Sequence, residues 1–142
     1  MNKLNKAAVN VLKNCMNLGE NEKVLIITDS ELSKIGGVFL KNAEKITENS
    51  DLVKIPIPAT HGAEPPAKVA KLMLKYDVIF GVTNKSISHT KARKNACEAG
   101  ARLASMPGIT KDIMQRAIEV DYDEMKDRTN IIADLLDKAK SA

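Results

Sequence analysis

The chain has 142 residues, of which 44% are hydrophobic, 28% are charged and 3% are aromatic, and its formal net charge is +4. This composition predicts a single globular domain over residues 1–142 with an aliphatic core, and it excludes a disordered chain. It also argues against a nucleic-acid partner, because such sites usually need stacking rings and concentrated basic patches.

The sequence carries no sign of export or of a membrane anchor. No apolar run reaches the roughly 18 residues that a membrane span requires, and residues 1–6 are polar. We therefore expect no membrane partner and a cytoplasmic protein. Cys15 and Cys97 are far apart and form no CxxC pair, so we expect both to be buried free thiols in a reducing compartment.

Helical and strand patterns alternate along the first 106 residues. Apolar residues at helical spacing predict helices, and short aliphatic runs such as "VLIIT" predict strands covered on both faces. This alternation favours a three-layer α/β fold, Rossmann-like or flavodoxin-like, with an open parallel four-stranded sheet in the order 2-1-3-4 and helices on both faces. In chain order the predicted elements are helix 2–17, strand 23–28, helix 30–46, strand 51–58, helix 65–77, strand 78–83, helix 88–100 and strand 101–106.

Individual residues predict where these elements begin and end. Gly19 and Gly100 are placed to end the first and fourth helices in left-handed caps. Ser30 and Ser88 are placed to cap the starts of the second and fourth helices. Pro56 lies near the end of the second strand, which indicates an edge position because proline cannot donate a ladder hydrogen bond.

Two further helices are predicted after the sheet. Thr110 begins the first, and Asp121 with Glu124 three residues later is typical of a capping box that begins the second. Both helices carry apolar residues at helical spacing. Those of the first, expected to face the core, are Ile113, Met114, Ala117 and Ile118, and those of the second are Met125, Ile132, Leu135, Leu136 and Ala139.

The glycine pair in "DSELSKIGG" invites comparison with a phosphate-binding loop. Such loops need glycines in the turn itself, whereas Gly36 and Gly37 come about two turns into the predicted helix and belong to no GxGxxG or GKS/GKT motif. We expect the pair to let the helix approach the sheet closely. No residue is assigned to cofactor binding.

The chain has two histidines, His61 and His89, which are candidate metal or catalytic residues. His61 and Glu64 offer one imidazole and one carboxylate, and His89 could join them only if the fold brings the two loops together. Ser88 and His89 are neighbours in sequence, which disfavours a nucleophile and base pair. No catalytic or metal residue is assigned. The amides after Ser88 could instead hold a small anion, helped by nearby cations.

Open parallel sheets bind ligands beyond the carboxyl ends of their strands, where the strand order reverses. In the order 2-1-3-4 that crevice lies between the first and third strands. His61 belongs to a loop at the same edge. The residues expected to line the cleft are Asp29, Ser30, His61, Thr83, Asn84, Ser88 and His89.

Three segments resemble a known family: "AAVNVLKNCMNLGENEKVLIITD", "HTKARKNACEAGARLASMPGIT" and "VDYDEMKDRTNIIADLL". They are similar to the N-terminal domain of the aminopeptidase T type of leucyl aminopeptidase, a thermophilic metallopeptidase family, and the similarity covers nearly the whole chain. In that family a larger catalytic domain follows and carries two divalent metals. The resemblance extends to a dihydroxypyridine ring-opening dioxygenase, whose iron ligands also lie outside this segment.

The resemblance implies a non-catalytic N-terminal α/β domain that helps to shape the substrate cleft and the oligomer of a metal-dependent aminopeptidase, a hydrolase. We expect no cofactor in this chain, with zinc, cobalt or manganese in the catalytic domain. The expected partners are that domain and a second copy of the chain in a homo-oligomer. Two alternatives stay open: an independent module that binds a small anion, and the corresponding domain of a dioxygenase-like relative.

Overall fold

A computed structural model of the protein describes residues 2–118 and 121–139. It confirms the predicted alternation of helices and strands, with shorter elements than the sequence pattern indicated. The elements are α1 (Lys3–Asn10), the π-helix η1 (Val11–Cys15), β1 (Val24–Thr28), α2 (Ser33–Ala43), β2 (Ser50–Lys54), α3 (Ala67–Met73), β3 (Val78–Val82), α4 (Lys91–Glu98), β4 (Arg102–Ser105), α5 (Lys111–Ile113), the π-helix η2 (Met114–Ile118) and α6 (Tyr122–Lys138).

The four strands form one parallel sheet in the order β2-β1-β3-β4, as predicted. Every residue of the central strands β1 and β3 is buried, because helices cover both of their faces. The edge strands β2 and β4 are only partly buried. β2 lies at the edge of the sheet and ends two residues before Pro56, so the edge position predicted from this proline is confirmed.

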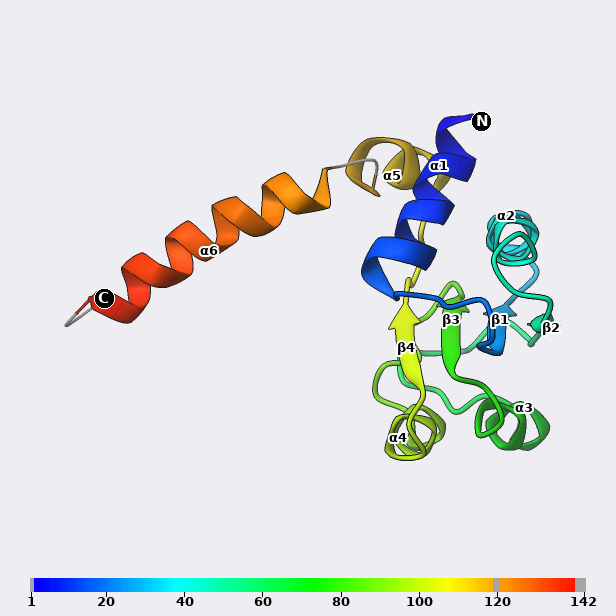
Figure 1. The fold of residues 1–142 in the computed structure, drawn as a ribbon. Coiled ribbons are helices and arrows are strands. Elements are labelled where there is room, and N and C mark those ends of the chain that lie inside the picture. The colour runs from blue at the N-terminus through cyan, green and yellow to red at the C-terminus, as the bar shows by residue number, and fades with distance from the viewer. Residues whose placement is uncertain (1, 119–120, 140–142) are drawn as a thin grey trace.

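Two hydrophobic cores lie on opposite faces of the sheet, and alternate side chains of the central strands point into one or the other. Val24, Ile26 and Phe80 belong to the core beneath α1 and α2, whereas Leu25 and Ile27 belong to the core beneath α3 and α4. Figure 1 shows the two helix layers on either side of the sheet. The predicted three-layer architecture is confirmed.

The two glycines of α2 differ in what they do. A Cβ on Gly36 would lie 3.0 Å from the Thr28 side chain, so this glycine does let α2 approach the sheet closely. A Cβ on Gly37 would meet nothing within 4 Å. The prediction for Gly37 is therefore wrong, because that position faces away from β1.

The first helix ends earlier than its apolar stripe predicted. After Asn10 the backbone widens into the π-helix η1, and the chain leaves it at Asn17, whose φ of 46° is left-handed. Gly19 has no such φ, so its predicted role is wrong; Gly100, with a φ of 104°, does end the fourth helix. Cys15 is exposed and Cys97 is half-buried, so the prediction that both thiols are buried is also wrong.

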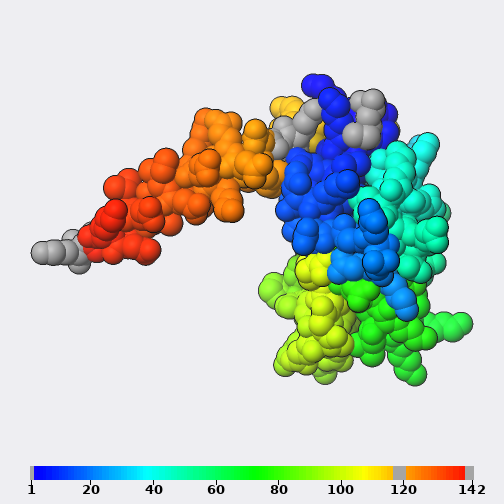
Figure 2. Space-filling view, in the orientation of Figure 1, coloured from blue at the N-terminus to red at the C-terminus, as the bar shows by residue number. Residues whose placement is uncertain are grey.

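The C-terminal part of the chain leaves the rest of the protein. Thr110 caps α5 as predicted, but Ile113 is exposed while Met114 is buried. The side chains of Ala117 and Ile118 are outside what the structure describes, so the predictions for them stay predictions. Asp121 caps α6, which then extends away from the elements α1 to η2, here called the α/β body (Figures 1 and 2). Its large apolar side chains are exposed.

A search of the described helices for a membrane span finds none of sufficient length and apolar character. The cytoplasmic location stays a prediction.

Candidate functional site at the carboxyl edge of the sheet

Asp29 organises the crevice between β1 and β3. It directly follows β1 and is fully buried. Its Oδ1 accepts hydrogen bonds from the amides of Glu31 (3.1 Å) and Leu32 (3.0 Å), and its Oδ2 accepts one from the amide of Asn84 after β3. A buried carboxylate needs such donors. Asp29 thus binds the two loops to each other and holds the turn before α2. The prediction that Ser30 caps this helix is wrong, because α2 begins after Leu32 without a side-chain cap.

The other crevice residues complete this closure. Asn84 also donates from its side-chain amide to the Glu31 carboxylate, which lies over the same crevice. The Thr83 hydroxyl is buried and donates to the carbonyl of Lys85 at 2.7 Å. Ser30 is exposed. At the crevice predicted between the first and third strands, these polar groups therefore hydrogen-bond to one another within the chain.

The start of α4 is occupied in the same way. Thr90 is the N-cap, because its hydroxyl accepts from the amide of Arg93 at 3.1 Å. The two amides between them, of Lys91 and Ala92, donate to the carboxylate of Glu64, which reaches across from the β2–α3 loop. Ser88 is not the cap. An external anion at these amides would have to displace Glu64.

His61, on the β2–α3 loop, contacts the loop between β3 and α4. Its Nδ1 accepts a hydrogen bond from the amide of Ser86 at 3.0 Å, and the amide of Gly62 donates to the carbonyl of Ser86 at 2.8 Å. Gly62 has a φ of 80°, and a Cβ there would lie 3.9 Å from the Cβ of His89. The loop that carries His61 and Glu64 is thereby latched onto the loop between β3 and α4.

A group of three serine hydroxyls lies beside this latch. Ser86 Oγ donates to Ser88 Oγ at 3.0 Å and lies 3.5 Å from Ser105 Oγ, and Ser105 Oγ accepts from the amide of Ile87 at 3.3 Å. These contacts orient the loop before α4. No carboxylate takes part in them, so the geometry lacks the acid that would orient a histidine base for a serine nucleophile.

The structure thus brings the predicted residues to one edge but not into one reaction centre. His61 and His89 lie on adjoining loops and both rings are exposed. Glu64 is committed to the α4 amides, and no group of three His, Cys, Asp or Glu side chains within the described residues could hold a metal ion. The local set of His61, Glu64 and His89 therefore does not fit a divalent cation.

Sequence patterns did not identify several residues that shape this edge. Glu64 lies 27 residues before the amide it caps, and no local spacing signals such a contact. Ser86 and Ser105 meet only through the fold. Thr90 could have been found, since a threonine is a favoured N-cap and α4 begins directly after it.

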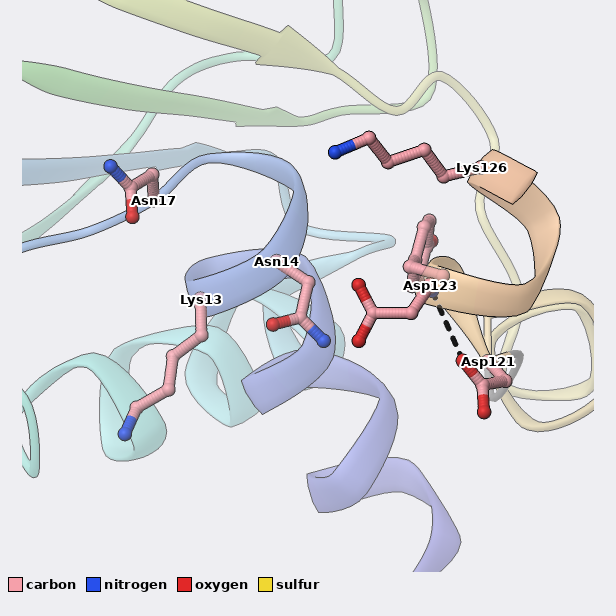
Figure 3. A pocket seen from close by; sticks show the side chains of 7 residues that line it. Lys13, Asn14, Asn17, Asp121, Asp123 and Lys126 are labelled. Carbon is pink, nitrogen blue, oxygen red and sulfur yellow. Dashed lines mark hydrogen bonds between the residues drawn. The ribbon is translucent and has the colours of Figure 1, made fainter. Parts of the chain in front are cut away.

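A polar groove of about 680 Å³ lies away from this edge, between η1 and the start of α6. Figure 3 shows Lys126 reaching across it and Asp123 directed toward Asn14. Tyr122 marks the contact of α6 with the body: partial burial raises its pKa to about 12, and a hydrogen bond with the Cys15 thiol adds to the rise. The residues that line the groove are Lys13, Asn14, Asn17, Asp121, Tyr122, Asp123 and Lys126.

Comparison with known proteins gives one weak likeness. No protein-family model and no curated protein matches the chain. Among solved structures, the fold is similar to that of wild-type AmpT, an aminopeptidase T, from Thermus thermophilus, with 13% sequence identity and a TM-score of 0.46. The match covers 82% of this chain and 41% of that chain. A likeness at this level carries no inference about activity.

Proposed function

We propose that this chain is a non-catalytic α/β domain of an aminopeptidase T-like metallopeptidase, in which it helps to shape the substrate cleft and the oligomer. The observation that carries the proposal is the closure of the carboxyl edge. Asp29 and Glu64 hold the backbone amides that open parallel sheets commonly offer to anionic ligands. The edge is therefore organised as a rigid surface rather than as a vacant anion site.

A rigid edge with exposed polar side chains suits the wall of a cleft whose chemistry comes from another unit. Ser30, His61 and His89 are exposed along it, and hydrogen bonds hold the loops beneath them. The three sequence segments that resemble the aminopeptidase T family support this assignment. In such an enzyme the divalent metal, zinc, cobalt or manganese, would belong to the catalytic domain.

The test is an aminopeptidase assay of the chain itself. Purified protein is incubated with aminoacyl chromogenic substrates and with zinc, cobalt or manganese, beside an active metallo-aminopeptidase as positive control. We expect release no faster than that of the metal in buffer. Metal-dependent turnover that His61→Ala or His89→Ala abolishes would overturn the proposal, because it would place reactive groups at this edge. Turnover that both variants retain would point to a contaminating peptidase, to be removed before the assay is repeated.

A further inference from the structure

The loop between β2 and α3 lies on the carboxyl edge with little apolar burial of its own. Residues 56–63, here called the strap, are all exposed or half-buried, whereas Ile55 before them and Pro65 after them are buried. Burial of apolar surface therefore fixes the two ends of the loop but not the strap between them. The strap is held in place by hydrogen bonds to neighbouring loops.

These hydrogen bonds form two latches of different chemistry. At the first latch, Nδ1 of His61 accepts from the amide of Ser86 at 3.0 Å, and the amide of Gly62 donates to the carbonyl of Ser86 at 2.8 Å. At the second latch, just after the strap, the carboxylate of Glu64 accepts from two amides at the start of α4. Each latch thus depends on a titratable acceptor, an imidazole in one and a carboxylate in the other.

The first latch requires a neutral imidazole. A neutral histidine carries a lone pair on one ring nitrogen and a proton on the other, so acceptance at Nδ1 places the proton of His61 on Nε2. Protonation of Nδ1 removes the lone pair and sets an N–H group against the N–H of Ser86. The latched state therefore binds one proton fewer than the released state, and a falling pH favours release.

We propose that protonation of His61 releases the strap from the loop between β3 and α4, so that the carboxyl edge is closed at neutral pH and loosened in mild acid. This inference deepens the proposed function and rests on it, since it names how the proposed cleft wall is regulated. Carboxylates ordinarily stay charged where histidines titrate. Glu64 therefore keeps its hold on α4, and the strap opens about that end and exposes the backbone of Ser86 to solvent.

The charges near the latch act in the same direction. The two amides of α4 already compensate the carboxylate of Glu64. A protonated His61 that stayed latched would lie among further cations as well as against the N–H of Ser86, and release relieves both contacts. The titratable and charged groups on the elements that meet at His61 are Glu64 of its own loop, Lys85 and His89 of the loop between β3 and α4, and Lys91, Arg93 and Lys94 of the first turn of α4.

The first experiment measures amide hydrogen exchange of the full chain by NMR from about pH 8 to about pH 5, the range in which histidine ordinarily changes its charge. Each rate is divided by the intrinsic exchange rate at the same pH. The amides of Ser86 and Gly62 should lose protection by about two- to tenfold, as expected for the loss of a hydrogen bond. The amide of Ala92, which Glu64 holds, should keep its protection. The loss should follow the ring titration of His61, observed in the same samples.

The second experiment uses variants that fix the acceptor. In His61→Asn the side-chain oxygen occupies a position like that of Nδ1 and accepts at every pH, so Gly62 should stay protected throughout the range. In His61→Ala the acceptor is missing, so Gly62 should be unprotected even at about pH 8. His89→Asn is the matched control, because it removes the other histidine of this edge, and it should loosen with pH like the natural chain.

Three results would overturn the inference. Gly62 could keep its protection while Ser86 loses it, which would mean that one hydrogen bond breaks without releasing the strap. The ring of His61 could stay neutral throughout the range, or His61→Asn could loosen as the natural chain does. If His61→Asn does not fold, the natural chain still decides, because the midpoints of the His61 titration and of the Gly62 exchange must coincide. None of these results touches the proposed function, which is tested by turnover at one fixed pH.

Discussion

The α/β body and α6 use similar residues in opposite ways. Ile26 and Ile27 of β1 are fully buried, whereas Ile131 and Ile132 of α6 are 62% and 59% exposed. In the body, the buried carboxylate of Asp29 and the carboxylate of Glu64 also accept hydrogen bonds from backbone amides of distant loops. The difference teaches that the body covers its apolar side chains with other parts of the chain, whereas those of α6 are left in solvent among the described residues.

The largest expected effect compares two identical substitutions, one in each region. Ile27→Ala should lower the free energy of unfolding by about 2–5 kcal/mol, because it empties space in the core beneath α3 and α4. Ile131→Ala should change it by no more than about 0.5 kcal/mol, because this side chain is largely in water. Denaturant unfolding at a concentration where the chain is monomeric measures both. Equal losses would mean that α6 folds back onto the body.

The next comparison concerns two carboxylate caps. Glu64→Ala should cost the body about 1–2 kcal/mol, because it leaves the amides of Lys91 and Ala92 without their acceptor. Asp121→Ala removes the local cap of α6, where Oδ1 accepts from Asp123 and Glu124 at 3.0 Å each. This second variant should reduce the helical circular dichroism signal while the unfolding midpoint of the body is unchanged.

The Glu64→Ala variant also tests the alternative that the start of α4 binds a small anion. Phosphate should not raise the unfolding temperature of the natural chain, since Glu64 already occupies the two amides. It should recover part of the stability lost in Glu64→Ala. A clear phosphate stabilisation of the natural chain would show that an external anion displaces Glu64 and would revive the small-anion module.

The smallest expected effect compares two arginine–glutamate pairs. Arg102 of β4 forms a two-pronged contact with Glu22, at 2.9 and 2.8 Å, and also donates to the carbonyls of Met16 and Asn17. Arg102→Ala should cost about 1 kcal/mol, the upper range for a partly exposed pair. Arg128→Ala breaks only the exposed pair with Glu124, four residues away, and should cost about 0.3–0.5 kcal/mol.

The contact between Arg102 and Glu22 also predicts a pH dependence of stability. The hydrogen bond from Arg102 holds the pKa of Glu22 below its ordinary value of 4.5. A lowered folded pKa means that the stabilisation is complete above about pH 4.5 and is lost as the pH falls through the lowered value. Stability measured between pH 6 and pH 3 should therefore fall less steeply in Arg102→Ala than in the natural chain. Identical slopes would show that Glu22 titrates normally in the folded state.

Much of the fold could be predicted because its patterns are local. The unbroken aliphatic run of β1, the helical spacing of α2 and the left-handed Gly100 each depend on residues close in sequence. For the candidate site, the sequence predicted its location at the carboxyl edge of the sheet but not the hydrogen bonds that organise it. Asp29 and Asn84 meet there through a hydrogen bond, and Glu64 and Ser105 act on residues 27 and 18 positions away. Such long contacts leave no periodic pattern.

By itself the sequence determined the α/β class, the parallel order of the sheet and the amphipathic character of α6, because hydrophobic periodicity and connection chemistry are properties of neighbouring residues. Only the tertiary structure decided which capping groups close the carboxyl edge and that the apolar side of α6 is left in solvent. The physical reason is that a carboxylate binds whichever amide the fold brings within 3 Å of it, and an apolar stripe is buried only where another surface of matching shape lies against it.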